Sequence, residues 1–339
     1  MKNYFPTLLS KSGEFKALSH LSHNVKSNIS PIIQVLNDSF DKTKKYLINS
    51  WSFKHNSILI DFSLSQNVNI EHKRNLLENL LSNDVNIIPV IDSNTPKDLI
   101  QHIKDLADNQ AVKKIGIRFS NETGGLININ SFINNSSETL GINKEDISII
   151  LDLGYVEAHN FNMLATLAIK TILSIESYES YENIIVASSS FLNNLSSLSP
   201  AGRLYRLPRY EWNIWLQIQN NIQSINIKYS DYGTKHPIFS QAPFAGTCSI
   251  KYSGENEYII YRGELSANHP EGNGQYIIFA DKLINTNDFP GKDYSWGDLQ
   301  IFEYANENLK NPKRKTGNAE SWVTISQNHH ITLMENLLG

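Results

Sequence analysis

Several features that would identify a class of protein are absent or scarce in this sequence. Cys248 is the only cysteine, so the chain can form no internal disulfide and has no Cys-x-x-Cys metal site. No run approaches the roughly 20 apolar residues of a transmembrane helix, and the first residues lack the apolar core of a secretion signal. We therefore expect a cytoplasmic protein with no membrane partner.

The short motifs of several large enzyme classes are missing as well. There is no GxxxxGK[ST] or GxGxxG sequence, which weighs against a P-loop nucleotidase and a dinucleotide enzyme. There is also no HxH or HExxH spacing of a zinc site and no GxSxG turn of a serine hydrolase. The formal net charge of −4 argues against a general nucleic-acid coat, but it leaves a local basic pocket open.

The feature that is present is a repeat of apolar runs and helix-patterned segments. The runs begin at residues 4, 31, 57, 86, 113, 147, 183 and 226, which gives spacings of 27, 26, 29, 27, 34, 36 and 43 residues. Continuous apolar strands separated by amphipathic helices indicate a parallel sheet covered by helices. Eight units predict an α/β fold, a (β/α)8 TIM-like barrel over residues 1–235, with a doubly wound open sheet as the alternative.

The pattern changes after residue 233. Residues 249–252 and 258–261 flank a turn and predict a β-hairpin, and residues 275–283 and 299–308 have helical spacing. We expect a strand at 322–325 and a closing helix at 329–338. No linker-like segment intervenes, so residues 236–339 are expected to be an α+β extension packed on the barrel. The polar stretch 188–203 is long for a connection, which suggests a lid.

In a barrel of this kind, the active site lies at the C-terminal ends of the strands. The polar residues that end or follow the predicted strands include Lys11, Glu14, Asp61, Arg118, Asp152, Asp231 and Tyr232. Several carboxylates on one rim repel each other unless a positive charge balances them. Ion pairing with Arg118 or Lys11 would balance them, and so would a divalent cation such as Mg²⁺ or Mn²⁺ held by Asp61 and Asp152.

The C-terminal extension adds further candidates. Arg262 and Glu264 lie at the end of the predicted hairpin, Trp296 lies in a turn, and His329 and His330 precede the last helix. Arg262, like Arg118, has the chemistry to hold a phosphate group. Adjacent histidines point in different directions, so at most one is expected to face a site, and a surface pair at the start of a helix is the alternative for both.

An ordered set of short segments resembles one known family. The segments are YFP at 4–6, KSGE at 11–14, AL at 17–18, SPII at 30–33, LPRYEW at 207–212, YSDY at 229–232, RGE at 262–264, QY at 275–276, SWGD at 295–298 and NHH at 328–330. Together they resemble the beta family proteins, which are named after a protein of phage T4. The resemblance runs from about residue 4 to 335. It implies a role associated with phages or with antiviral defence, but no reaction.

Two functions follow from these observations. The first is a metal-dependent hydrolase of a phosphate-containing substrate such as a nucleotide or nucleic acid. In it Asp61 and Asp152 are metal ligands or base, His329 or His330 is the acid, and Lys11, Glu14 and Asp231 complete the catalytic candidates. The substrate-binding candidates are Arg118, Tyr232, Arg262, Glu264 and Trp296. The second is a non-catalytic module that recognises a phage component or a partner protein from the same gene cluster.

Overall fold

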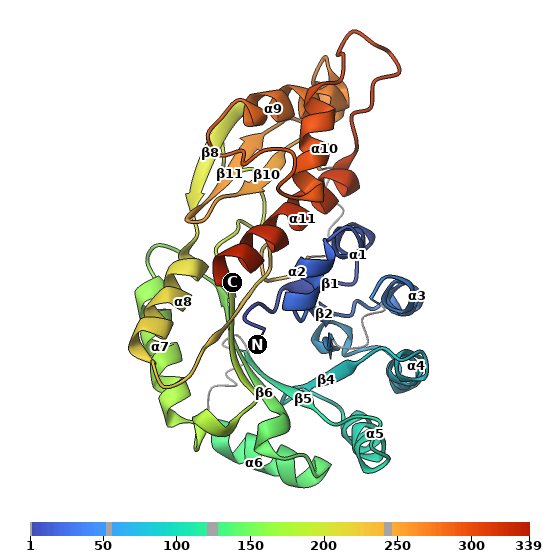
Figure 1. Ribbon diagram of the computed structural model, residues 1–339, viewed down its shortest axis with the longest axis vertical. Helices are drawn as coiled ribbons and strands as arrows, with labels where there is room; N and C mark the ends of the chain where they lie inside the picture. Colours follow the sequence, from blue (N-terminus) through green and yellow to red (C-terminus); the bar gives the residue numbers. More distant parts are fainter. Residues whose placement is uncertain (1, 52–55, 121–127, 241–245) are drawn as a thin grey trace. The chain divides into compact units, whose positions relative to one another are not determined.

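The computed structural model describes residues 2–51, 56–120, 128–240 and 246–339 (Figure 1). The chain forms two compact units, each assembled from three stretches. The stretches of the first unit are Met1–Lys11, Lys26–Ser189 and Tyr210–Tyr232. Those of the second unit are Ser12–Val25, Ser190–Arg209 and Gly233–Gly339. The largest part of the second unit thus begins near the expected boundary at residue 235, but two earlier segments also belong to it.

The first unit contains eight parallel strands in the order β1-β2-β3-β4-β5-β6-β7-β9. The strands are β1 (Thr7–Leu9), β2 (Ile32–Gln34), β3 (Ile58–Asp61), β4 (Ile87–Ile91), β5 (Ile115–Ser120), β6 (Ile147–Tyr155), β7 (Asn183–Ser189) and β9 (Lys228–Asp231). Each lies within or next to one of the eight predicted apolar runs. The order follows the sequence, as the right-handed repetition of βα units requires.

Backbone contacts bring the two ends of this sheet together. Tyr4 forms parallel bridges with both Ile29 and Tyr229. The amide of Phe5 donates to the carbonyl of Tyr229 at 2.8 Å, and the amide of Tyr229 donates to the carbonyl of Asn3 at 2.9 Å. The sheet is therefore a nearly closed barrel. This confirms the predicted (β/α)8 architecture over the open-sheet alternative.

Helices alternate with the strands and lie on the outside of the sheet (Figure 1). They are α3 (Phe40–Ser50), α4 (Ile70–Ser82), α5 (Lys97–Asp108), α6 (Ile129–Leu140), α7 (Phe161–Ser174) and α8 (Tyr210–Asn221). The helix α4 shows why such segments fold. Asn69 caps its first turn by accepting from the amide of Glu71, and Leu76, Leu77 and Leu80 bury one face.

Apolar side chains from most of the strands fill the interior of the barrel. One cluster consists of Phe5, Ile32, Leu59, Ile88, Val90, Ile150, Ile185 and Ala187. All of them are at most 4% exposed. Most of the strands are largely apolar because one side chain faces this cluster and the next faces a helix. Several polar side chains, including Asp61 and Asp231, lie where the strands end.

The second unit contains a three-stranded antiparallel sheet in the order β10-β11-β8. Its strands are β8 (Arg203–Pro208), β10 (Ile250–Ser253) and β11 (Glu257–Arg262). Its helices are α1 (Ser12–Ser19), α9 (Gln275–Ile284), α10 (Trp296–Ala305) and α11 (Ala319–Leu338). The short α2 (His23–Asn28) contains a point where the chain passes between the units.

One local prediction for this unit is wrong, and one strand was not predicted. Residues 322–325 lie within the 20-residue α11 and are not a strand. Asn318 starts this helix by accepting from the amide of Ser321, and Trp322 and Ile325 bury its apolar face. The polar stretch expected as a connection is free of helix and strand over residues 190–202. The strand that was not predicted is β8, which pairs with β11, and its Tyr205 and Leu207 pack on the cluster that contains Tyr258 and Ile260.

Within the residues that the structure describes, no helix is long and apolar enough to cross a membrane.

Candidate functional site

Arg118 on β5 is the centre of a polar cluster at the carboxyl ends of the barrel strands. One terminal nitrogen of its guanidinium forms an ion pair with Asp61 at the end of β3, and the other with Asp152 on β6. Arg118 also donates to the hydroxyls of Ser63 at 3.2 Å and Tyr232 at 2.9 Å. The phenol of Tyr232 in turn donates to Asp152 at 2.8 Å. The barrel thus brings together Asp61, Arg118, Asp152 and Tyr232, all of which were sequence candidates.

This Arg118 cluster is shielded from solvent. The side chains of Asp61, Asp152 and Arg118 are 3%, 6% and 11% exposed. Burial by itself would lower the pKa of Arg118, but Tyr232, Asp152 and Asp61 raise it well above its usual value. Burial raises the pKa of Tyr232, so its phenol keeps the proton that it donates. With two carboxylates and one guanidinium, the cluster carries a formal charge of −1.

The two carboxylates do not fit a bound Mg²⁺ or Mn²⁺ in this arrangement. Besides Arg118, Asp61 accepts from the amide of Ser63 at 2.8 Å, and Asp152 accepts from the amide of Gly154 at 3.0 Å. A hard divalent cation takes six or more oxygen ligands. No group of three or more His, Cys, Asp or Glu side chains that could hold a metal occurs among the described residues. Arg118 therefore supplies the balancing charge that the rim requires.

Gln34 on β2 is a member of this cluster that the sequence did not suggest. When its amide oxygen faces Arg118, it accepts from both terminal nitrogens, at 2.6 and 3.2 Å. Gln34 pairs in register with Asp61 on the neighbouring strand, so the barrel places both at the same level. Gln34 sits within an apolar run, and nothing in the local sequence distinguishes it from a chance polar residue.

A second carboxylate, Asp92, lies beside Asp61 after β4. Both line a cavity of about 10 Å³ together with Lys73 on α4. Asp92 accepts from the amide of Asn94 and the hydroxyl of Thr95, each at 2.9 Å. Burial raises the pKa of Asp92, and the nearby Asp61 adds to that effect. Burial lowers the pKa of Lys73, whose side chain is almost fully enclosed. Asp92 directly follows the last residue of β4, Ile91.

The two other barrel candidates have different neighbours. Asp231, at the end of β9, is fully buried and accepts from the phenol of Tyr4 at 2.9 Å, which links the last strand to the first. Lys11 follows β1 and is exposed. Its pKa is lowered by partial burial, an effect that the nearby Asp38 opposes.

In the second unit, both candidate histidines lie in the middle of α11 and are buried. One imidazole nitrogen of His329 lies 2.9 Å from Asp298, and the other lies 2.9 Å from the carbonyl of Ser253. His330 lies 2.8 Å from the hydroxyl of Ser253. Burial alone would raise the pKa of Asp298, but His329 and the hydroxyls of Ser295 and Tyr252 lower it. The histidines are therefore not the surface pair at a helix start that was the alternative for them.

The remaining candidates also belong to the second unit. Glu14 on α1 forms a buried ion pair with Lys235. The indole of Trp296 stacks on His20, with ring centroids 3.9 Å apart. Arg262 ends β11 and donates from its Nε to the carbonyl of Leu195 at 2.9 Å, while Glu264 lies exposed just beyond it. These side chains belong to the second unit, so the structure divides the sequence candidates into two groups.

Comparison with known proteins gives one finding on family membership. A family model described as "Beta protein" matches residues 4–335, which is nearly the whole chain. No curated protein matches the chain significantly.

Proposed function

Since the chain belongs to the beta protein family, we propose that it is an enzyme that hydrolyses a phosphate-containing substrate at the carboxyl ends of its barrel strands. A cytoplasmic role associated with phages or antiviral defence is part of this proposal, and its support is the family resemblance. We also include in it an α+β extension beyond residue 235, whose support is that β10, β11, α9, α10 and α11 all lie in the part of the second unit that begins at Gly233.

The observation that carries the proposal is the pair Asp61 and Asp92 around a space that matches one water molecule. A cavity of about 10 Å³ is at the lower limit of the space that holds a single water molecule. Hydrolysis needs a base that takes a proton from water and an acid that gives one to the leaving oxygen. Two carboxyl groups perform both tasks when their environments differ.

The environments of these two groups differ in this way. Asp61 is ion-paired with Arg118 and accepts a further hydrogen bond from the amide of Ser63, as a carboxylate does. Asp92 has a pKa raised by burial, which favours its protonated form. In the proposed reaction, Asp61 takes the proton of the attacking water and Asp92 protonates the departing oxygen. Lys73 offsets the negative charge that develops on the phosphate.

The test is a hydrolysis assay on a panel of nucleotides and short oligonucleotides. Loss of a general acid or base costs about 10²–10⁴ in rate, so Asp61→Asn and Asp92→Asn should each lower kcat by about that factor. Asp41→Asn on α3 is the control, because that side chain is fully exposed. The rate should fall as the pH rises through the raised pKa of Asp92, and Asp92→Asn should remove this limb. Unchanged turnover in both rim variants would contradict the proposal.

One observation favours the second candidate, a non-catalytic recognition module. Arg118 already donates to two protein carboxylates and two hydroxyls, so a substrate phosphate would have to compete with them. A recognition module would show no turnover on any member of the panel, and affinity capture with products of neighbouring genes would then recover a specific partner. Recognition needs no proton transfer, so a folded Asp61→Asn variant should still recover that partner.

A further inference from the structure

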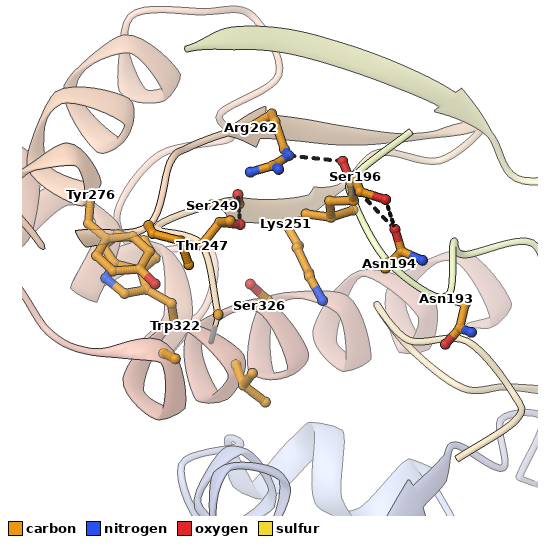
Figure 2. A pocket seen from close by; sticks show the side chains of 15 residues that line it. Asn193, Asn194, Ser196, Thr247, Ser249, Lys251, Arg262, Tyr276, Trp322 and Ser326 are labelled. Carbon is orange, nitrogen blue, oxygen red and sulfur yellow. Dashed lines mark hydrogen bonds between the residues drawn. The ribbon is translucent and has the colours of Figure 1, made fainter. Parts of the chain in front are cut away.

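The second unit contains a pocket that is separate from the barrel residues discussed so far. It has a volume of about 580 Å³, within the range of about 300–1,000 Å³ typical of small-molecule sites. The edge of the β10–β11 hairpin, α9, α11 and residues 193–196 form its walls (Figure 2). All the residues that line it belong to the second unit.

The charge of this pocket is opposite in sign to that of the protein. Fifteen residues line it, including Lys251 and Arg262, and none of them is an aspartate or glutamate. The lining therefore carries a formal charge of +2 in a chain whose net charge is −4. A concave surface lined by one sign of charge concentrates ligands of the opposite sign.

Neither cation has a carboxylate partner among the described residues. Arg262 donates to the main-chain carbonyls of Leu195 and Gly263, which hold the guanidinium in place without neutralising it. The ammonium of Lys251 lies 4.9 Å from the centroid of the Phe191 ring. Burial lowers the pKa of Lys251 to about 8. A lysine in this setting is stabilised by a bound anion, because the anion restores the charge balance.

Hydroxyl groups surround the two cations. Ser249 directly precedes β10 and lies two residues before Lys251, so the two side chains face the same side of the hairpin. The hydroxyls of Thr247 and Ser249 lie 2.8 Å apart, and Ser326 on α11 faces the same space as Lys251 (Figure 2). Hydroxyls and cations that converge in this way are the donors that proteins use to hold phosphate oxygens.

The opposite wall of the pocket is aromatic and apolar. The rings of Tyr276 and Trp322 are stacked with centroids 4.9 Å apart and planes 12° apart. Leu265, Val323 and Ala319 are further apolar residues that line the pocket. The indole nitrogen of Trp322 donates to the carbonyl of Thr316, and this bond fixes the ring. The two rings are each 2% exposed, so they meet the pocket over a small apolar area. An apolar wall next to a cationic end suits a ligand that has both a ring and an anionic group.

We propose that this pocket binds a nucleoside monophosphate, with the phosphate at Arg262 and Lys251 and the base against the wall formed by Tyr276 and Trp322. The site is independent of the proposed hydrolysis in the barrel, and a loss of either function leaves the other to be measured. It gives the protein a means to respond to a nucleotide or to the 5′-phosphorylated end of a nucleic acid.

Isothermal titration calorimetry of the full-length protein tests this proposal. The probes are adenosine 5′-monophosphate, adenosine, inorganic phosphate and a 5′-phosphorylated trinucleotide. Removing one charge-assisted contact costs about tenfold or more in affinity. We therefore expect Lys251→Met and Arg262→Gln each to weaken binding of the monophosphate by about that factor. Adenosine and phosphate alone should bind more weakly than the monophosphate, because each fills half of the pocket.

Two controls isolate the contribution of the pocket. Arg203→Gln on β8 removes an exposed arginine outside the pocket and should leave the affinity unchanged. The affinity of the wild type should fall as the pH rises through about 8, where Lys251 loses its proton, and this decline should be absent in Lys251→Met. Thermal unfolding of each variant shows whether it is folded. If Arg262→Gln does not fold, the binding measurement on Lys251→Met is sufficient to test the proposal.

Two results would overturn the proposal. One is that neither the monophosphate nor the trinucleotide binds the wild type. The other is that the folded variants bind them as tightly as the wild type does. Preferential binding of the trinucleotide would identify the 5′-phosphorylated end of a nucleic acid as the ligand. Preferential binding of the monophosphate would identify a free nucleotide as the ligand.

Discussion

Arg118 in the barrel and Arg262 in the second unit have charge environments of opposite kinds. Arg118 in the barrel forms ion pairs with both Asp61 and Asp152. Arg262 in the second unit bonds only main-chain carbonyls among its described contacts and shares its pocket with Lys251. The first arginine is satisfied by the protein itself, while the second retains its charge for a ligand.

This difference indicates where each unit can bind an anion. A guanidinium that already holds two carboxylates offers little net attraction to a phosphate, because the local charge is negative. An uncompensated cation in a pocket gains free energy from the first anion that neutralises it. Two arginines that look equivalent in the sequence therefore have different roles, and the number of acidic neighbours separates those roles.

The largest effect on stability should come from Arg118→Met. The change leaves Asp61 and Asp152 buried without a counter-charge, which typically costs about 3–5 kcal/mol of unfolding free energy. Urea denaturation of the variant and the wild type measures the difference. Lys104→Met is the control, because Lys104 pairs with Asp108 at the surface, where an ion pair contributes at most about 1 kcal/mol. If Arg118→Met lowers the unfolding free energy as little as the control does, the charges of Arg118, Asp61 and Asp152 do not stabilise one another.

An intermediate effect is expected from Asp298→Asn in the second unit. A hydrogen bond to a charged group contributes about 1.5–3 kcal/mol, and Asn keeps the shape of the side chain but loses its charge. The pKa of Asp298 is lowered in the folded protein, so its contribution is present above the unfolded value of about 3.9 and is lost as the pH falls through the folded value.

The stability difference between wild type and Asp298→Asn should therefore be large at neutral pH and should shrink under acid conditions. Denaturant titrations at neutral and at acid pH measure this stability difference. Asp293→Asn is the control, because Asp293 is exposed. A difference that stays constant with pH would show that the charge of Asp298 is not what His329 stabilises.

The smallest effect, and one of opposite sign, should come from Lys251→Met. Without ligand the ammonium has no carboxylate partner among the described residues, so its removal should raise stability by up to about 1 kcal/mol. The folded pKa of about 8 lies below the unfolded value of about 10.4, so the unfolded chain binds the extra proton between these values. The advantage of the variant should therefore shrink as the pH rises from about 8 to 10.

Denaturation of Lys251→Met across this pH range, compared with wild type, checks the prediction. A clear loss of stability in the variant would show that Lys251 has a stabilising partner within the protein and would remove the contrast with Arg118.

Much of the barrel could be predicted because its strands correspond to apolar runs that are recognisable in the sequence. A run such as Ile147–Tyr155 is mostly apolar, and its glycine Gly154 has a positive φ of 72° where the strand ends. Once the eight strands are placed, the meeting of Asp61, Arg118 and Asp152 follows from the geometry of the fold. The partners Gln34 and Ser63 do not follow, because long-range packing decides which polar neighbours face the guanidinium.

The second unit was harder to predict because its patterns are mixed. The buried face of α11 contains Gln327, Asn328 and both histidines, so polarity does not mark which side of the helix is inside. Residues 322–325 therefore resembled a short strand. Lys251 gave no signal either, since residues that line its pocket come from segments as distant in sequence as 193–196 and 319–326.

The most direct test of the contrast between the two arginines is a crystal structure of the protein with adenosine 5′-monophosphate. We predict phosphate density between Arg262 and Lys251, with the base against Trp322 and with Asp61 and Asp152 still paired to Arg118. Phosphate density on Arg118, with its carboxylates displaced, would contradict the account.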